Sequence, residues 1–383
     1  MLGQRTSLAA TSTILAAALA LGACGGAPAG PVDGAQAASP KSTAAEASAQ
    51  GAGRSQGLAT PGNDPKIVAA ARAALQCTWS EEATFDRECA AFNEWADSQD
   101  LLGEDEDKAA LTLLNLVEDE DVKVRYLALY RFPTRGALFG DKALAGRLLA
   151  QAERESSGHV AGSLGEAVSR IDVEKTGLFP RIKKLAESHP SEDLRKGVLR
   201  RLLASNRASR EVFEWVRGAL KSDDPKVRYL AVMSINDGED AFREEACADL
   251  VRMLEDPAAE VVGLTAQTFG YGTCPGQIDA FLAYAKKRAE AAGVKEWLIA
   301  NALINLCDRD KASEAQKKEV DAIARKLATG KNDDTVRADA MRATVRCDPV
   351  RGRQFVLVFK KDGSFRLKQE AEKILAEPPP KKK

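Results

Sequence analysis

The hexapeptide KVRYLA occurs twice in the chain, at 123–128 and at 226–231. Each copy follows a cluster of acidic residues and leads into an apolar run. Equivalent apolar positions recur between and beyond the two copies, at Val124, Val160, Leu194, Val227, Val261, Trp297, Val336 and Phe365. The successive intervals are 36, 34, 33, 34, 36, 39 and 29 residues, so the two copies lie three repeats apart. A period of this length is typical of solenoid proteins.

Each repeat is predicted to contain two helices. In the segment 225–236, Val227, Leu230, Ala231 and Ile235 follow the spacing of one helix face, and the segment 209–220 before it has an apolar face of its own. Such a pair leaves an apolar stripe that only a neighbouring pair can cover. The fold predicted is therefore an all-α superhelix of about seven to eight helical hairpins.

The start of the second helix carries a recurring signal. Asp224 followed by Pro225 is an N-cap followed by proline at the first helical position. Segments 255–257 and 332–334 are interpreted in the same way.

The arrangement Asp-x-x-Val-Arg-x-x-Ala at these starts resembles HEAT repeats, and the resemblance covers about residues 104–377. It implies an α-solenoid in which loop aspartates and second-helix arginines form a ladder that links successive repeats. The residues that match these positions are Asp121, Arg125, Asp224, Arg228 and Arg337.

The amino terminus reads as an export signal. Arg5 precedes an apolar run from Leu8 to Leu21, and the run ends in Leu21-Gly22-Ala23-Cys24. This tetrad resembles a bacterial lipobox, which implies removal of residues 1–23 and attachment of lipid to Cys24. Gly25, in place of aspartate, implies sorting to the outer membrane of a two-membrane cell. An ordinary secretory signal with an incidental cysteine remains the alternative.

The remaining domain boundaries follow from composition and spacing. Residues 24–63 are mostly Gly, Ala, Ser and Pro and are predicted to form a disordered tether. Residues 64–103 are predicted to be a helical N-terminal cap, with helices near 65–75 and 86–99. The repeats fill 104–377, and 378–383 is predicted to be a disordered tail. The run 355–359 suits either a hairpin strand or a helix, and the repeat spacing favours the helix.

Six cysteines remain after Cys24, namely Cys77, Cys89, Cys247, Cys274, Cys307 and Cys347. An even number in an exported chain favours disulfides. Cys77 and Cys89 flank a short loop and are the first pair expected. Cys274, Cys307 and Cys347 each end a predicted helix, and their pairing with one another or with Cys247 stays open.

The sequence offers few groups for catalysis or metal binding. Its only two histidines, His159 and His189, lie at expected loops, where a solvated histidine is the ordinary occupant. Cysteine or histidine pairs with zinc spacing are absent, as are the His-Glu pairs through which some HEAT-repeat enzymes hold metal. The acidic runs at 104–107 and 118–121 lack the order of a calcium loop and precede predicted helices. Phosphate-binding glycine loops are absent too. We therefore expect no catalytic residue, cofactor or metal site.

The charges nearly cancel, with 55 Lys and Arg against 56 Asp and Glu, which argues against nucleic acid as a partner. A denser basic stretch between Arg195 and Lys221 reads as a solvated rim or as a docking patch for an acidic partner. The expected function is a scaffold in the bacterial cell envelope, held to the membrane by its lipid. It would bind an unknown protein or peptide on its concave face, with Tyr126, Tyr229 and Arg342 as candidate contacts. Two alternatives are a HEAT-like subunit of a lyase or hydroxylase and a purely structural envelope protein. The sequence does not reveal the oligomeric state.

Overall fold

The computed structural model describes residues 56–80, 85–98, 106–291, 297–309 and 311–378. The predicted signal peptide, Cys24 and the last five residues lie outside these ranges. The chain divides into two units, Met1–Gly53 and Arg54–Lys383, and the description below concerns the second. Within the described ranges, no helix combines the length and apolar character needed to cross a membrane.

The described residues form helices, with one isolated β-bridge between Trp79 and Phe85. Eight helical hairpins follow one another along these residues, as the repeat period predicts. The first helices of the hairpins are α3 (Glu106–Val117), α5 (Lys142–Arg154), α8 (Phe179–Ser188), α10 (Arg210–Ala219), α12 (Asp240–Met253), α14 (Ile278–Glu290), α16 (Glu314–Thr329) and α18 (Pro349–Asp362). The second helices are α4 (Val122–Tyr130), α6 (Gly158–Val168), α9 (Glu192–Ser205), α11 (Pro225–Asn236), α13 (Ala259–Gly270), α15 (Trp297–Asp308), α17 (Asp334–Cys347) and α19 (Phe365–Ala376).

The shorter elements lie before and between the hairpins. They are η1 (Gly57–Ala59), α1 (Pro65–Ala74), α2 (Ala90–Asp97), η3 (Ala137–Phe139), α7 (Val173–Thr176) and η4 (Pro275–Gln277). The prediction that 355–359 is helical is confirmed, because this segment lies inside α18.

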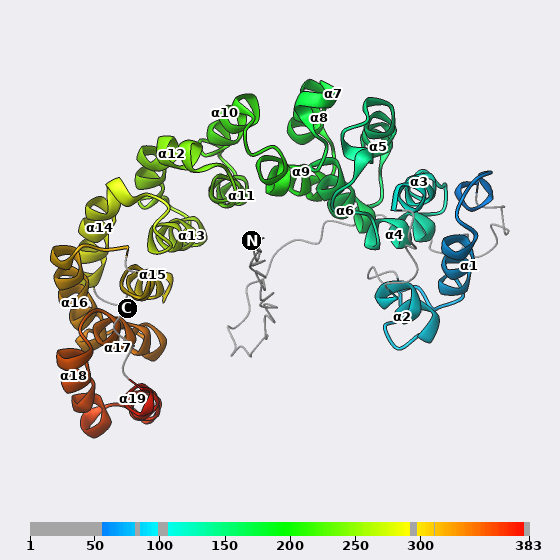
Figure 1. The fold of residues 1–383 in the computed structure, drawn as a ribbon. Coiled ribbons are helices and arrows are strands. Elements are labelled where there is room, and N and C mark those ends of the chain that lie inside the picture. The colour runs from blue at the N-terminus through cyan, green and yellow to red at the C-terminus, as the bar shows by residue number, and fades with distance from the viewer. Residues whose placement is uncertain (1–55, 81–84, 99–105, 292–296, 310, 379–383) are drawn as a thin grey trace, which may run out of the picture. The chain divides into compact units, whose positions relative to one another are not determined.

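The second helices pack against one another in order, from α4 on α6 to α17 on α19. Figure 1 shows them on the inner side of the row of hairpins and the first helices on the outer side. The contact is closest between α6 and α9. A Cβ atom added to Gly165 would lie 2.4 Å from the carbonyl oxygen of Leu194, and one added to Gly197 would lie 2.4 Å from that of Gly162. These two glycines therefore let the backbones of neighbouring repeats touch.

The repeat positions found in the sequence fall at the starts of the second helices. Six of the eight are the third residue of their helix, and of these only Val227 is not fully buried. The prediction was wrong at Trp297 and Phe365, which are the first residues of α15 and α19 and are 50% and 78% exposed. The buried third residues there are Ile299 and Leu367.

The folded unit begins earlier than the predicted boundary at residue 64. Residues 56–63 were expected to belong to the tether, but Leu58 is buried and the backbone N–H of Gly57 donates to Asp119 at 2.6 Å. The side chain of Asn63 donates to the carbonyl oxygen of Gly57 at 2.7 Å. These contacts hold the segment against α3, because each buried polar group finds a partner there.

Cap helix α1 has nearly the predicted bounds, whereas α2 begins at Ala90, four residues later than predicted, and ends at Asp97. The indole N–H of the buried Trp95 on α2 donates to the carbonyl oxygen of Leu127 on α4 at 3.0 Å. The cap is thus joined to the first repeat by a buried hydrogen bond as well as by apolar packing.

The six cysteines within the described ranges form three pairs at disulfide distance, Cys77 with Cys89, Cys247 with Cys274, and Cys307 with Cys347. The first pair is the one expected first, and the other two resolve the pairing that the sequence left open. The last pair joins the second helices of two successive hairpins, α15 and α17. Disulfide formation itself stays a prediction for chemical analysis.

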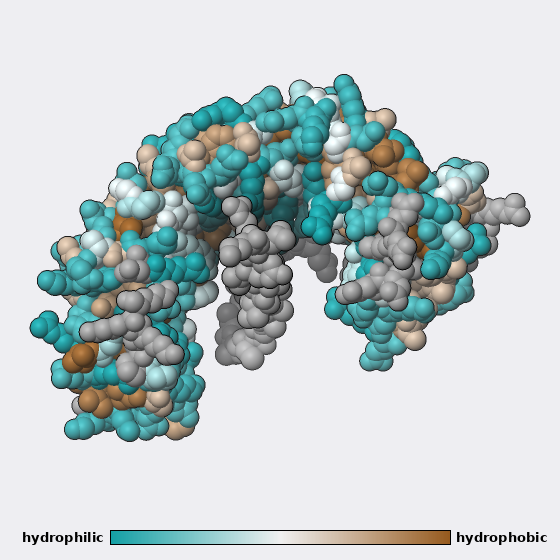
Figure 2. Space-filling view, in the orientation of Figure 1, coloured by the Kyte–Doolittle hydropathy of each residue, from teal (hydrophilic) through white to brown (hydrophobic). Residues whose placement is uncertain are grey.

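Much of the surface is hydrophilic (Figure 2). Apolar side chains are exposed on the last hairpin, at Val350, Leu357, Val358 and Phe365.

Candidate functional site

Two arginines link successive repeats, and both are the fourth residue of a second helix. Arg125 forms a two-point ion pair with Glu155, at 2.8 and 2.9 Å, and Arg228 forms one with Asp256, at 2.7 and 2.8 Å. The carboxylates lie in the next hairpin, and all four side chains are nearly buried. Both arginines also donate to two carbonyl oxygens in the loop before their own helix. Each arginine therefore fixes its own loop and the following repeat.

The other residues assigned to the ladder have different roles. Asp121 and Asp224 accept the backbone N–H of Lys123 and of Lys226, so they cap their own helices and do not pair with an arginine of a neighbouring repeat. Arg337 donates to the carbonyl oxygen of Ala328 at 2.9 Å and lies near Asp334 of its own helix. The short aspartate side chain explains the difference, since at an N-cap it reaches the free N–H groups directly.

The carboxylates that pair with Arg125 and Arg228 occupy equivalent loop positions, two residues before the N-cap of a second helix. This position accepts the N-cap N–H in five successive hairpins, and its occupants are Asp119, Glu155, His189, Ser222 and Asp256. His189 was expected to be solvated, but it is buried, and its Nδ1 accepts the N–H of Ser191 at 3.1 Å. It therefore serves as a structural acceptor.

A groove of about 700 Å³ lies on the second-helix side of the middle repeats. We call it the inner groove. It is lined by Gly158, His159, Gly162, Ser163 and Glu166 of α6, by Asp193, Lys196, Gly197 and Arg200 of α9, by Lys226, Tyr229 and Leu230 of α11, and by Glu260 of α13. Residues from four consecutive second helices thus form one continuous surface.

Two lysines from neighbouring helices lie close together in the inner groove. The Lys196 side chain is 17% exposed and pairs with Glu192. Burial and the nearby charge of Lys226 lower the pKa of Lys196, and Asp224 opposes this effect. Within the described ranges, no carboxylate forms an ion pair with the Lys226 ammonium. The groove therefore holds an excess of positive charge at this point.

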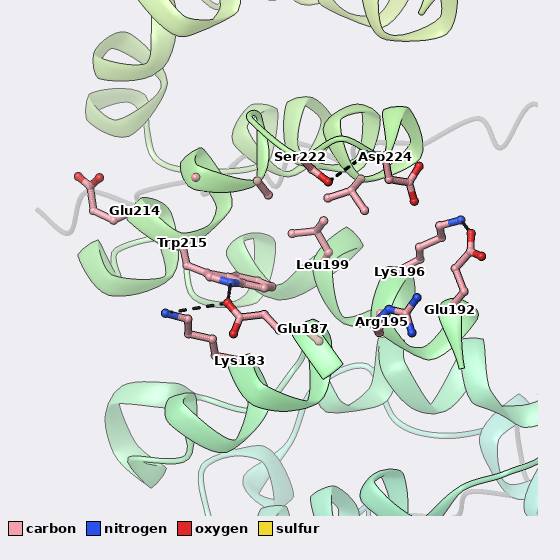
Figure 3. A pocket seen from close by; sticks show the side chains of 14 residues that line it. Lys183, Glu187, Glu192, Arg195, Lys196, Leu199, Glu214, Trp215, Ser222 and Asp224 are labelled. Carbon is pink, nitrogen blue, oxygen red and sulfur yellow. Dashed lines mark hydrogen bonds and ion pairs between the residues drawn. The ribbon is translucent and has the colours of Figure 1, made fainter. Parts of the chain in front are cut away.

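A second cavity of about 540 Å³ opens beside the turns of the hairpins α8–α9 and α10–α11. We call it the edge pocket, and Figure 3 shows the side chains that line it. The half-buried indole of Trp215 forms one wall, with its N–H donating to Glu187 at 3.0 Å. Leu199 and Val227 add apolar surface. Lys196 lines both cavities, so the edge pocket and the inner groove meet at this residue.

Aromatic side chains continue the surface from the groove toward the cap. The ring of Trp79 lies edge-on to His159, with 5.8 Å between the ring centroids, and edge-on to Tyr126 at 5.2 Å. Tyr126 in turn lies beside the exposed Tyr130. Burial and the neighbouring Tyr130 raise the pKa of Tyr126, and the charge of Arg87 partly opposes this effect. The raised pKa keeps the phenol neutral.

The three contact residues suggested by the sequence are spread along the row. Tyr229 lines the inner groove, whereas Tyr126 belongs to the aromatic surface. Arg342 pairs with Asp339 at 2.8 Å and also with Glu370, so its charge is already engaged. Of these three residues, only Tyr229 lines the inner groove or the edge pocket.

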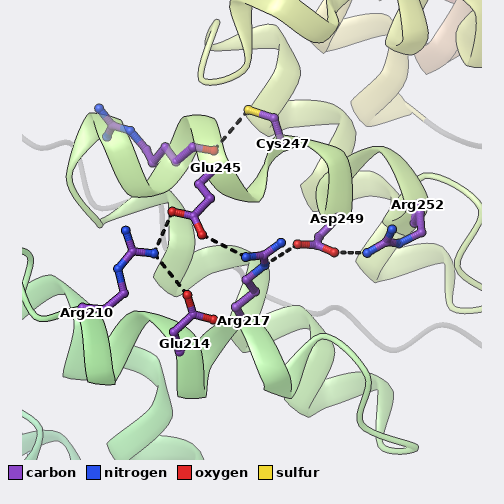
Figure 4. A network of polar contacts seen from close by, with 8 residues as sticks. Arg210, Glu214, Arg217, Glu245, Cys247, Asp249 and Arg252 are labelled. Carbon is purple, nitrogen blue, oxygen red and sulfur yellow. Dashed lines mark hydrogen bonds and ion pairs between the residues drawn. The ribbon is translucent and has the colours of Figure 1, made fainter.

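Several basic side chains of the stretch between Arg195 and Lys221 form ion pairs within the protein. Arg210 pairs with Glu214 and Glu245, and Arg217 pairs with Glu245 and Asp249 (Figure 4). These contacts tie α10 to α12 and favour the solvated rim for this part of the stretch. Arg200 pairs with Glu166 and Lys196 with Glu192. Lys196 and Arg200 belong to the same stretch but line the inner groove.

The described residues hold no group of three or more His, Cys, Asp or Glu side chains placed to bind one metal ion. The described acids near 118–121 have structural partners, since Glu118 pairs with Arg147 and Asp119 accepts two backbone N–H groups.

One family model matches the middle of the chain. A family model described as HEAT repeats matches residues 179–268, which run from α8 into α13 and include parts of both cavities. No curated protein matches the sequence. Among solved structures, an engineered protein of the Northeast Structural Genomics Consortium is 15% identical, covers 70% of this chain and 94% of its own, and has a TM-score of 0.25. A designed armadillo repeat protein is 12% identical, covers 84% of this chain and 96% of its own, and has a TM-score of 0.19. With its own helix pairs and the family match, the chain is an all-α, HEAT-like solenoid.

Proposed function

We propose that this HEAT-like solenoid is a lipid-anchored scaffold of the bacterial cell envelope that binds a protein partner through its second-helix side and performs no catalysis. The observation that carries the proposal is the inner groove, to which four consecutive second helices contribute side chains. A surface made by several repeats suits a long segment of a partner better than a small substrate.

The anchoring part of the proposal rests on the sequence alone. The apolar run that ends in Leu21-Gly22-Ala23-Cys24 supports lipid attachment at Cys24, with the stretch before residue 56 joining the lipid to the solenoid. Two or more acyl chains give stable membrane attachment, since each buried CH₂ group contributes roughly 0.8 kcal/mol. The outer membrane is the proposed site, because Gly25 follows the cysteine.

The absence of catalysis is proposed from the chemistry of the groove. Its one histidine, His159, is exposed and lies against Trp79. Of its three carboxylates, Glu166 is paired with Arg200, and neither Asp193 nor Glu260 is in contact with that histidine in the described part of the chain. A general base usually needs a positioned partner and a substrate within hydrogen-bond reach. The inner groove supports recognition of a polar chain segment more directly than it supports bond cleavage.

Two measurements test the halves of the proposal separately. For the anchor, the wild type should fractionate with membranes and carry fatty acid on its amino-terminal peptide, and Cys24→Ser should remove both properties. A soluble wild type without fatty acid would refute the anchor.

For the scaffold, the protein is crosslinked in its native membranes and captured. Tyr229→Glu should lose the specific partner that the wild type retains, whereas Lys184→Glu, on the outer helix α8, should keep it. Equal retention by both variants would refute binding through the inner groove.

A further inference from the structure

The proposed function leaves open what kind of segment the inner groove accepts. Two features of the groove bear on this question: the pair of lysines and a set of glycines that the fold itself does not require. Both concern side chains from α6, α9 and α11.

The lysine pair favours one additional negative charge. Lys196 and Lys226 come from neighbouring helices and line the same groove. Burial, and after it the charge of Lys226, lower the pKa of Lys196. Glu192 pairs with Lys196, but Lys226 has no such pair in the described part of the chain. A carboxylate placed between the two ammonium groups would form charge-assisted hydrogen bonds with both.

The rest of the groove does not attract a strongly charged ligand. Arg200 is neutralised by Glu166 at 2.8 Å, and Asp193 and Glu260 add negative charge elsewhere on the wall. The groove as a whole therefore suits a largely neutral segment with a single acidic side chain at the lysine pair.

Glycines on α6 leave room for a closely approaching chain. A Cβ atom at Gly158 would meet nothing within 4 Å, and one at Gly162 would approach no atom closer than 3.8 Å. Packing therefore requires neither glycine, although glycine inside a helix costs stability relative to alanine. Four glycines in α-helices are free of close neighbours in this sense. Gly158, Gly162 and Gly218 line the two cavities, and Gly146 on α5 lies outside them. Glycine without a packing role is expected where another backbone approaches closely.

We propose that the inner groove receives an extended segment of the protein partner, with one aspartate or glutamate side chain between Lys196 and Lys226 and its main chain along the Gly158–Gly162 face of α6. This inference rests on the proposed function and specifies it further. We expect small, neutral residues beside its acidic residue, because a main chain that lies close against α6 leaves no room for a bulky side chain between the two.

Selection from a random peptide phage library tests the chemistry without knowledge of the partner. The wild type should enrich peptides that share one acidic residue flanked by small residues. Lys226→Glu should abolish that preference or replace the acid by a basic residue, and Lys184→Glu, which makes the same change of charge on α8, should retain it. A consensus without an acid, a consensus unchanged in Lys226→Glu, or a failure to enrich any peptide would overturn the inference.

Alanine substitutions test the glycine face with a matched control. Gly162→Ala and Gly146→Ala should both raise the melting temperature, because each replaces glycine by a better helix former without creating a steric clash. Only Gly162→Ala should weaken binding of the synthetic consensus peptide, by about tenfold, which corresponds to about 1.4 kcal/mol. Equal binding by the two variants would overturn the glycine contact.

Failure of this inference is distinguishable from failure of the proposed function. If Tyr229→Glu loses the native partner while Lys226→Glu selects the same peptides as the wild type, the groove binds a partner and the acidic contact is wrong. If Tyr229→Glu and the wild type retain the same native partner, the proposed function itself fails.

Discussion

Arg228 on α11 donates two hydrogen bonds to Asp256 of the next hairpin, from Nε to Oδ2 at 2.7 Å and from Nη2 to Oδ1 at 2.8 Å. Asp256 also accepts the N–H of Ala258, which is the N-cap of α13. One side-chain pair therefore sets the position of α13 relative to α11, and the inner groove is built on both helices.

Loss of this arginine should destabilise the protein more than loss of its counterpart on α17. Arg228→Ala leaves the nearly buried Asp256 carboxylate without its cation, which should lower the free energy of unfolding by about 3 kcal/mol. Arg337→Ala removes an arginine at the same helix position whose ion pair lies within its own helix, and it should cost about 1 kcal/mol. Urea denaturation measures both values, and equal losses would argue against a special role for the link between repeats.

The same pair predicts a loss of stability in acid. Burial raises the pKa of Asp256, but the hydrogen bonds from Arg228 and Ala258 and the Arg228 charge outweigh it and hold the pKa below its usual range. A carboxyl whose pKa is lower in the folded state contributes stability that is complete above its unfolded pKa of about 4. This contribution should disappear as the pH falls from about 4 through the folded pKa. Asp256→Asn should therefore show a shallower decrease of unfolding free energy across that range than the wild type; identical slopes would contradict the assignment.

The sequence predicted the helix pairs but not the partners of the ladder arginines. Helix pairs follow from a period and a pattern of apolar residues, both of which are local. Glu155 and Asp256 lie 30 and 28 residues beyond their arginines, at a loop position that also accepts a histidine and a serine. The position varies in residue type because its shared task is only to accept the N-cap N–H. Its distance from the N-cap is the signal that would have identified it.

The misplaced repeat position at Phe365 has a local cause. At α19 the N-cap is Ser364, so the third helical residue is Leu367, and the aromatic Phe365 two residues earlier was assigned to the repeat position in its place.

The lining of the inner groove could not be predicted from the sequence for another reason. Gly162 and Gly165 look alike in the sequence, and only the register of α6 against α9 distinguishes the open glycine from the one in backbone contact.

That distinction gives opposite expectations for two neighbouring glycines. Gly165→Ala would place a Cβ atom 2.4 Å from the carbonyl oxygen of Leu194, and the overpacking should cost about 1–3 kcal/mol. Gly162→Ala should instead stabilise the free protein by roughly 0.5–1 kcal/mol. Thermal unfolding of both variants decides the matter, and a stabilised Gly165→Ala would mean that α6 and α9 are farther apart than described.

The pair Cys77 and Cys89 should support the aromatic surface next to the groove. Trp79 lies in the segment between these cysteines and contacts Tyr126 and His159. Replacing both cysteines by serine should lower the free energy of unfolding by about 2–4 kcal/mol and weaken partner binding. Replacing Cys307 and Cys347 should also reduce stability but leave partner binding intact, since that pair lies on α15 and α17.

Peptide mapping without reduction checks the pairs themselves. It should recover three linked peptides, joining 77 to 89, 247 to 274 and 307 to 347. Free thiols or other linkages in the protein isolated from the cell envelope would contradict the pairing.

Binding of a partner to the second-helix side of this solenoid can be measured by photo-crosslinking in living cells. A photoreactive amino acid is placed at Tyr229 or Arg200 in the inner groove, or at Lys184 or Lys142 on the outer helices. We expect one crosslinked product of the same mass from both inner positions and none of that mass from the outer positions. Crosslinks to the partner from the outer positions, with none from Tyr229 or Arg200, would contradict it.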